Sequence, residues 1–404
     1  MTIFYIIFIC LAVYFSFRYD GIEEYDTHKQ HRLWFMCFYL VCLAGFSYGL
    51  GGDKFTYMRE FEVYPDTFSE TYDYVWVNAM LKGQMPLWTL LNLSCKVLFG
   101  SFYAVQFIQS AAINVSVCYV MSKYTHRYFL FLLVYFFSLQ YFIFNTEVMR
   151  EGFALSFILV GMHGWVSGRK WLYFLTLPIG LLFHISAVVA ILFPFVRMRI
   201  SWLTLAIAFA FSFAVWALSD VVLGAVMLFA RGGIGALVQK VLFYSIQAST
   251  IFGFLRSAIT YLIFPFIIMY SSLQLERTVE GRKRKEKLIA YMIVLAVFVS
   301  SFAGFTRLYN SVQVFYLAAL TDFIYNLFRF KEHLLLRLGT FAGTAFLIFL
   351  TYNISYKSTN TRYYDFFYPY TCILNEDKSV YIREIAHDEA VRAEESDNNV
   401  RNIE

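Results

Sequence analysis

The feature that most constrains this chain is a succession of apolar runs that are long enough, or nearly long enough, to cross a lipid bilayer. They lie at Thr2–Phe17, Leu33–Leu50, Ser101–Met121, Tyr128–Phe144, Gly152–Val166, Trp202–Leu218, Ile251–Leu273, Leu288–Phe302, Leu308–Phe328 and Leu338–Tyr352. A membrane-spanning helix needs about 20 mostly apolar residues, because the hydrocarbon core is about 30 Å thick. Only 15% of the residues are charged, whereas about 25% are charged in soluble domains. The sequence therefore predicts an all-α, polytopic integral membrane protein.

The basic residues predict how the chain is oriented. Cytoplasmic loops of membrane proteins are rich in Lys and Arg, and the clearest such loop is Glu276–Lys287. If this loop is inside, the other short basic loops also fall inside, both termini lie outside, and the loop Gly51–Pro86 is outside. The run Thr2–Phe17 has no basic region before it and no small-residue cleavage site, so we expect a retained span. The net charge of +5 then reflects topology, and we expect no nucleic-acid partner.

Two further stretches are less regular. Trp171–Val196 lies between two basic clusters, so a single crossing would place one of them on the wrong face. We expect a broken pair of short helices that reverses near Phe183-His184-Ile185-Ser186, where irregular backbone needs a covering of protein or a water-filled cavity. One long tilted helix with a buried His is the alternative. Leu87–Phe99 is short and contains Lys96, which predicts an interfacial or re-entrant helix on the outer face.

The spans predict two parts. Residues 1–355 form a polytopic domain of about 12 transmembrane helices including the broken pair, and residues 356–404 form an extracytoplasmic C-terminal tail. The end of the tail, around Ala386–Asn402, is polar enough to predict partial disorder. We assign the tail no chemistry.

One acidic candidate follows the second span. Asp53 comes directly after Gly51-Gly52, and glycines allow a sharp turn as the chain leaves the bilayer. A carboxylate held at the outer surface could orient or deprotonate a hydroxyl group. The alternative is that Asp53 caps the turn that follows it.

The outer half also holds four arginines and a histidine. His184 lies at the expected helix break, and the arginines are Arg150, Arg231, Arg256 and Arg307. A guanidinium fork matches phosphate oxygens, and ionisable groups among apolar spans usually face the interior of the bundle. These residues suggest a site for a large anion. A single Arg at the interface is, however, also an ordinary membrane anchor.

Several catalytic motifs are absent from the sequence. The patterns GxxxxGK[ST], HExxH and GxSxG do not occur, so nucleotide-driven pumping, zinc proteolysis and elbow-type serine hydrolysis lack their motifs. We expect neither a metal nor a cofactor. The outer-loop aromatics fit either an interfacial belt or a surface on which sugars stack; they are Tyr57, Tyr64, Tyr72, Tyr74 and Trp76.

Several short motifs occur in order along the chain. They are Gly52-Asp53-Lys54 with Tyr57 and Phe61, Asn145 with Arg150-Glu151-Gly152-Phe153-Ala154, Leu182-Phe183-His184-Ile185-Ser186-Ala187, Arg307-Leu308-Tyr309, and Pro369-Tyr370. Together they resemble the EpsG family of bacterial exopolysaccharide proteins, which is related in role to Wzy-type polysaccharide polymerases. The resemblance covers roughly Thr2–Leu374. The sequence departs from the family pattern at Glu151, where Gln is expected, and at the Lys that follows Gly-Asp.

The resemblance implies a membrane glycosyltransferase that polymerises exopolysaccharide, capsule or O-antigen. It would join undecaprenyl pyrophosphate-linked oligosaccharide repeat units at the outer face of the bacterial inner membrane and release the lipid pyrophosphate. A GT-C-like helical bundle fits such a reaction, and a chain-length regulator and a flippase are the partners that it suggests. The alternatives are that this chain is itself a flippase for the lipid-linked oligosaccharide, or an acyltransferase that modifies the glycan.

The candidate residues then divide by role. Asp53 or His184 would be the catalytic residue that takes the proton from the acceptor hydroxyl. A neutral imidazole suits general-base work near neutral pH, whereas Asp53 would need a raised pKa or a purely orienting role. Substrate binding is assigned to Lys54, Tyr57, Arg150, Arg231, Arg256, Arg307 and Tyr309. Arg150 and Arg307 would together bind the pyrophosphate, because arginines stabilise the charge that develops on a leaving group.

Overall fold

The computed structural model describes residues 2–69, 71–82, 84–219, 221, 250–329, 349, 352–353, 361–374 and 378–401. These residues form helices and their connections, with one isolated antiparallel bridge between Ser47 and Cys372. The all-α prediction is therefore confirmed for the described part of the chain. The chain forms two compact units, which are Met1–Ser156 with Ile324–Glu404, and Phe157–Phe323.

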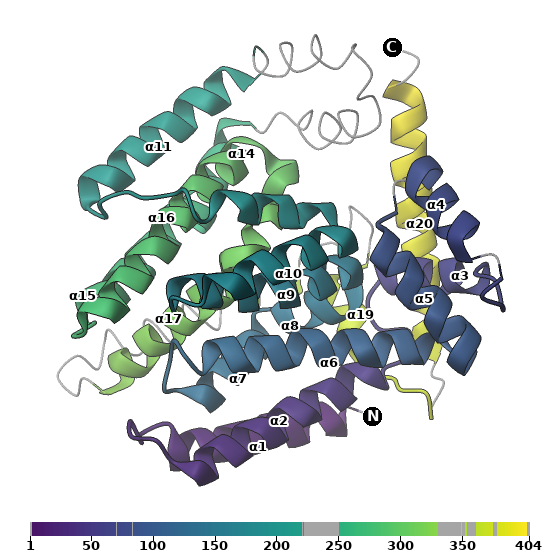
Figure 1. The fold of residues 1–404 in the computed structure, drawn as a ribbon, viewed down its shortest axis with the longest axis horizontal. Coiled ribbons are helices and arrows are strands. Elements are labelled where there is room, and N and C mark those ends of the chain that lie inside the picture. Colours follow the sequence, from purple (N-terminus) through teal and green to yellow (C-terminus); the bar gives the residue numbers. More distant parts are fainter. Residues whose placement is uncertain are drawn as a thin grey trace. The chain divides into compact units, whose positions relative to one another are not determined.

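The first unit is built around packed apolar helices, with α2 against α6 and α1 against α7 (Figure 1). Leu33, Met36 and Leu40 recur every three or four residues on α2 and are fully buried, as an amphipathic helix requires. Its helices are α1 (Ile3–Tyr19), α2 (Thr27–Gly45), α3 (Asp53–Glu62), α4 (Thr71–Lys82), α5 (Pro86–Phe99), α6 (Phe102–Met121), α7 (Tyr128–Phe137), α8 (Gln140–Phe142), the π-helix η1 (Ile143–Glu147), the start of α9 (Met149–Val166), the end of α17 (Asn310–Arg329), α19 (Tyr363–Phe367) and α20 (Lys378–Arg401).

Two of the basic loops are in contact at one end of this unit. The Lys29 ammonium, near the start of α2, donates to the carbonyl oxygens of Ile22 at 2.7 Å and His126 at 2.6 Å. Arg127 forms an ion pair with Glu23 at 2.8 Å. The turn after α1 therefore meets the turn before α7, as expected for loops on one side of a membrane.

The other ends of α1 and α2 meet the C-terminal part of the chain. The Tyr5 hydroxyl donates to the Phe367 carbonyl at 3.2 Å, and the Tyr48 N–H donates to the Thr371 carbonyl at 3.0 Å. The segment after α19 is thus held against the turn that follows α2.

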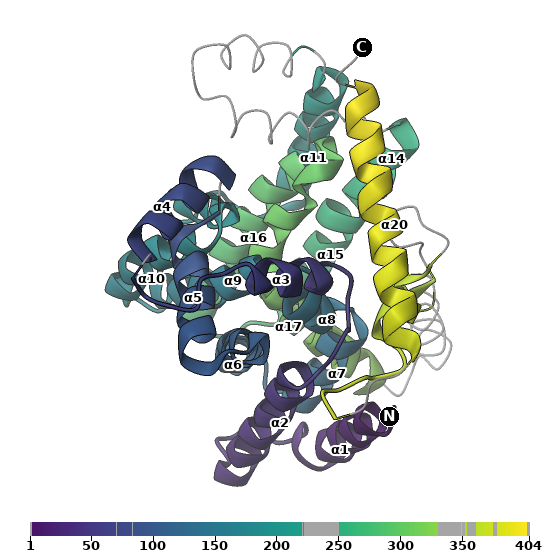
Figure 2. The ribbon, with the colours of Figure 1, turned by 90° about the vertical axis from the view of Figure 1, so that its right-hand side faces the viewer.

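The polar end of the chain, for which composition predicts partial disorder, contains a helix. α20 runs to Arg401 and contacts α3, which runs roughly across it (Figure 2). Ala386 and Ala390 are buried, with exposed fractions of 3% and 0%. Partial disorder at the end of the tail stays a prediction.

The loop Gly51–Pro86 also contains more structure than expected. It holds α3 and α4, and the predicted interfacial helix at Leu87–Phe99 is α5. α3 buries Phe55, Tyr57 and Phe61, which recur at helical spacing. The position of α5 relative to a membrane stays a prediction.

In the second unit, α16 packs against α11, α14 and α15 (Figure 1). The elements of this unit are the rest of α9, α10 (Lys170–Phe183), the 3-10 helix η2 (Ile185–Leu192), α11 (Trp202–Ala217), α14 (Ile251–Ala258), the π-helix η3 (Ile259–Ile263), α15 (Phe264–Gln274), α16 (Val279–Ser301), the 3-10 helix η4 (Ala303–Tyr309) and most of α17.

The predicted break between Trp171 and Val196 is confirmed. α10 ends at Phe183, His184 is extended with φ −158° and ψ 135°, and η2 follows. The Tyr173 hydroxyl donates to the Ala190 carbonyl. Since these residues lie on either side of the break, η2 folds back along α10, and a single long helix is excluded.

By length and hydropathy, α6 and the continuous run Ile251–Gln274 could each cross a membrane. A third candidate is α7 together with Gln140–Glu147, bent by 77°. The helices α1, α5, α10 and α11 are apolar but shorter. About 12 spans therefore stays a prediction, and the predicted span Leu338–Tyr352 falls almost wholly outside the described residues. The division into a domain at residues 1–355 and a tail also stays a prediction.

Candidate functional site

The first motif, Gly52-Asp53, forms the N-terminus of α3. Glu147, which lies between Asn145 and Arg150 of the second motif, caps this helix. The Glu147 carboxylate accepts from the Gly52 N–H at 2.7 Å and from the Asp53 N–H at 3.3 Å. The first N–H groups of a helix have no partner within the helix, and the helix dipole favours an anion there. Glu147 therefore fixes the start of α3. Asp53 is not the capping residue, because Gly52 occupies the N-cap position.

Gly51 lets the two motifs approach each other. Its φ is +78°, and a Cβ atom added there would lie 2.5 Å from Thr146 Oγ1 and 2.6 Å from Thr146 Cβ. Glycine adopts such a φ without steric cost, and no larger residue fits between the two chain segments. The glycines before Asp53 thus serve close packing as well as turning.

Arg150 stands beside the face of α3 that carries Asp53. Its guanidinium lies over the Tyr57 ring, 5.3 Å from the centroid, and interacts electrostatically with Glu60. Asp53, Tyr57 and Glu60 are spaced four and three residues apart, so they share one face of the helix. The structure therefore brings three of the predicted residues, Asp53, Tyr57 and Arg150, into one site.

Lys54 faces the protein interior. Its side chain is fully buried, and Nζ donates to the carbonyl and the hydroxyl of Ser47 at 2.9 and 2.8 Å. The Gln106 amide donates to the same carbonyl at 2.9 Å. Burial lowers the pKa of Lys54 well below its usual range, and the nearby Arg383 lowers it further. This geometry favours a structural role, in holding the turn after α2, over the expected substrate contact.

The C-terminal helix completes the surroundings of α3. The Thr56 hydroxyl is hydrogen-bonded to His387 Nε2 at 2.9 Å. Arg59 forms ion pairs with Asp388 at 2.7 Å and Glu384 at 2.8 Å. Sequence analysis had assigned no chemistry to this helix, whose residues nevertheless line the site.

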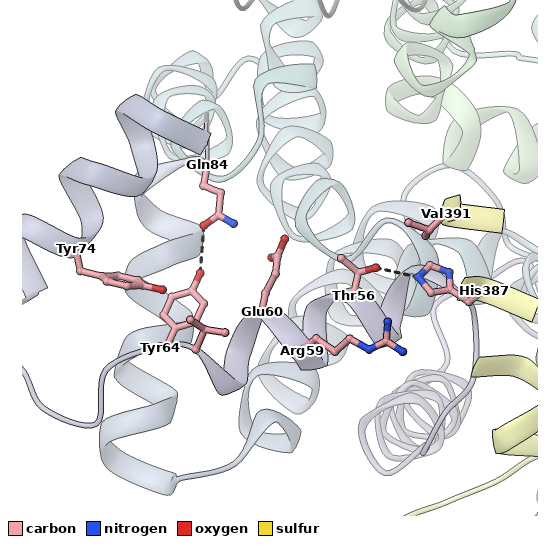
Figure 3. Close-up of a pocket in the computed structure, with 9 residues that line it drawn as sticks. Thr56, Arg59, Glu60, Tyr64, Tyr74, Gln84, His387 and Val391 are labelled. Carbon is pink, nitrogen blue, oxygen red and sulfur yellow. Dashed lines mark hydrogen bonds between the residues drawn. The ribbon is translucent and has the colours of Figure 1, made fainter. Parts of the chain in front are cut away.

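A cavity of about 380 Å³ opens between α3, α4 and α20. Its lining includes Arg59, Glu60, Tyr64, Tyr74, Gln84 and His387. Figure 3 shows the Glu60 side chain between the Tyr64–Gln84 pair and the Thr56–His387 pair. The Tyr64 hydroxyl donates to Gln84 Oε1 at 3.4 Å, and the Tyr64 and Tyr74 rings are 5.2 Å apart.

His184 belongs to the second unit, at the break between α10 and η2. Its Nδ1 accepts the Ser186 N–H at 3.2 Å and is 2.8 Å from the Ser186 hydroxyl. In a neutral imidazole whose Nδ1 accepts a hydrogen bond, the proton is on Nε2. This arrangement favours His184 as a hydrogen-bond donor rather than as a base. The wet outer cavity expected around it stays a prediction.

Three further predicted residues also belong to the second unit. Arg256 lies in α14 and Arg307 in η4, and both are exposed. Tyr309 is buried, with its ring 5.3 Å from that of Tyr261. Arg231 lies outside the described residues. Because Arg150 and Arg307 belong to different units, their approach to each other stays a prediction.

Glu147, Glu60 and His387 were missed as site residues. Glu147 ends an apolar run, and a carboxylate in such a position usually faces a bundle interior. Glu60 would have followed from Asp53 if a helix start had been recognised at Gly52-Asp53. Glu151, where Gln was expected, is buried in the first turn of α9. Within the described part of the chain, no three His, Cys, Asp or Glu side chains gather as ligands for a metal ion.

The fold and the site define a class, namely all-helical membrane proteins with an arginine and a carboxylate at a loop beside the apolar helices. The chain belongs to the EpsG family, whose sequence model matches residues 32–372. The resemblance of the motifs is thereby confirmed, and the family indicates a membrane protein of polysaccharide biosynthesis. Comparison with curated proteins and with solved structures gives no match.

Proposed function

We propose that this protein is a membrane polysaccharide polymerase of the bacterial inner membrane, with its site open to the exterior. It joins undecaprenyl pyrophosphate-linked repeat units by glycosyl transfer. The acceptor hydroxyl oxygen bonds to the anomeric carbon of the donor glycan, and the bond from that carbon to the pyrophosphate breaks. The electron pair leaves with the lipid pyrophosphate, and the hydroxyl proton passes to a carboxylate of the protein or to water.

The observation that carries this proposal is the position of Arg150 beside the α3 face with Asp53. Arg150 is held over Tyr57, and a fixed guanidinium can stabilise charge as it develops on a leaving pyrophosphate. Asp53 is half-buried in the first turn of α3. A carboxylate in this position can orient the acceptor hydroxyl and accept its proton. The geometry therefore supports Asp53 better than His184 in this role.

The test is polymer formation by the purified protein in liposomes. A lipid-linked repeat unit is added without any nucleotide, and products are resolved as a ladder. A flippase would move the substrate across the bilayer without making a ladder. A ladder therefore supports the polymerase, and the absence of a ladder from folded protein contradicts it.

The role of Arg150 is tested in the same assay. Arg150→Ala should lower the rate by about 10²–10³, as expected for loss of one charge-stabilising donor. Arg150→Lys should recover only part of the rate, because an ammonium lacks the guanidinium fork. The matched control is Arg18→Ala, which removes an exposed arginine from the last turn of α1. An unchanged ladder from folded Arg150→Ala protein would refute the assignment.

A further inference from the structure

We propose that the cavity between α3, α4 and α20 binds a neutral sugar residue, with Glu60 accepting hydrogen bonds from its hydroxyl groups. Naming that sugar as part of the glycan substrate rests on the proposed function, whereas the binding itself does not. The cavity of about 380 Å³ lies within the range of roughly 300–1,000 Å³ that is typical of small-ligand sites.

Glu60 provides the polar anchor. Its Oε2 atom is buried and has no hydrogen-bond partner in the described structure, and the side chain projects between the two walls of the cavity (Figure 3). A buried polar atom without a partner is costly. Sugar hydroxyl groups would supply the missing donors as charge-assisted hydrogen bonds.

Aromatic and amide groups complete a surface suited to a sugar ring. Tyr64 and Tyr74 offer adjacent tilted rings, with centroids 5.2 Å apart. Gln84 has an exposed fraction of only 9% and lines the same cavity. Ligand sites typically combine apolar or aromatic walls with a few placed polar groups, and a pyranose presents both a C–H face and hydroxyl edges to such a site.

The charge around the cavity argues against an anionic ligand. Arg59 lines the cavity but is engaged by the carboxylates of Glu384 and Asp388. Glu60 adds a carboxylate in the cavity lining, whereas Arg150 acts on Glu60 from beside α3 and Arg392 acts on Asp388. Because the guanidinium in the lining is already paired and the Glu60 carboxylate repels anions, the cavity disfavours a phosphate or a uronic acid and favours a neutral sugar.

The location links the cavity to the reaction. Glu60 and Tyr64 both interact electrostatically with Arg150, and Glu60 shares a helix face with Asp53. A sugar held at Glu60 would therefore lie next to the guanidinium proposed to bind the pyrophosphate. We assign to the cavity the glycan end of the substrate and to Arg150 its phosphate end.

The test measures sugar binding without turnover. Full-length protein in lipid nanodiscs, where no sugar-headed detergent competes, is titrated with the methyl glycosides of glucose, galactose and N-acetylglucosamine. Binding is followed by saturation-transfer NMR. We expect the wild type to bind at least one of them. Glu60→Gln should weaken that binding by about tenfold, since it replaces a charged acceptor by a neutral amide, and Tyr74→Ala should also weaken it.

The matched control is Glu62→Gln, which removes an exposed carboxylate from the same helix and should leave sugar binding unchanged. Thermal unfolding of each variant shows whether it is folded. The inference is overturned if none of the three sugars binds, or if Glu60→Gln binds as well as the wild type. Sugar binding by a protein that makes no ladder would reject the polymerase and leave the sugar site standing. A ladder from a protein that binds no sugar here would do the reverse.

Discussion

The substitution Glu147→Gln should loosen the N-terminus of α3 by an amount that can be worked from the structure. One carboxylate oxygen accepts the Gly52 N–H at 2.7 Å and the other accepts the Asp53 N–H at 3.3 Å. Glutamine keeps one acceptor oxygen and replaces the other by an NH₂ group, so one N–H loses its acceptor. An orphaned buried donor costs about 1–3 kcal/mol, and the lost interaction with the helix dipole adds about 0.3–1 kcal/mol.

A total near 2 kcal/mol corresponds to roughly a 30-fold larger open population at this helix end. Hydrogen–deuterium exchange with mass spectrometry measures that population through the Gly52 and Asp53 amides, in overlapping peptides of the purified protein. Glu62→Gln, at the other end of α3, is the control and should leave exchange at Gly52 and Asp53 unchanged. If Glu147→Gln exchanges at the wild-type rate at both amides, the carboxylate does not cap α3 and the proposed link between the two motifs is wrong.

Two further predictions concern the same turn. Gly51→Ala should lower the free energy of unfolding by about 2–4 kcal/mol, since it adds an unfavourable φ to an overlap with Thr146. Gly168 also has a positive φ, of +82°, but a Cβ atom added there would have no neighbour within 4 Å. The losses of stability in Gly51→Ala and Gly168→Ala, measured by thermal unfolding, should therefore differ by the overlap alone. Equal losses of stability would contradict the contact with Thr146. The pKa of Lys54 is depressed in the folded protein. Between that depressed pKa and the ordinary lysine value of 10.5, the unfolded state binds more protons than the folded state, so stability should rise with pH over this interval. Lys54→Met should flatten this rise in thermal midpoint, and an identical pH profile in the variant would show that Lys54 is not buried as described.

The helices and the break at His184 could be predicted from the sequence because their signals are local. An apolar run, or two basic clusters at its ends, lies within one stretch of chain. The start of α3 could not be predicted in this way, since its cap, Glu147, is 95 residues from Gly52. α20 was missed for the same reason, because His387 meets Thr56 across 331 residues. The pairing that orders such polar segments cannot be seen in their own composition.

Candidate residues that are neighbours in the sequence lie in different surroundings. Asp53, Tyr57 and Arg150 form one site, but Lys54, from the same motif, turns inward to Ser47. Sequence position alone does not separate them, because consecutive residues of a helix point in directions about 100° apart. A residue next to a catalytic candidate in sequence therefore lies on a different face of the helix.

This division changes how loss-of-activity data on the family motifs should be interpreted. Gly51, Lys54 and Glu147 build the turn, through a close approach to Thr146, hydrogen bonds to Ser47 and a cap on α3. Asp53 and Arg150 lie at the face that the turn positions. Substitution in either group should abolish polymer formation, but only the first group should also lower the thermal midpoint and raise exchange at Gly52 and Asp53. Activity alone therefore cannot assign a catalytic role in this motif, whereas activity lost at full stability can.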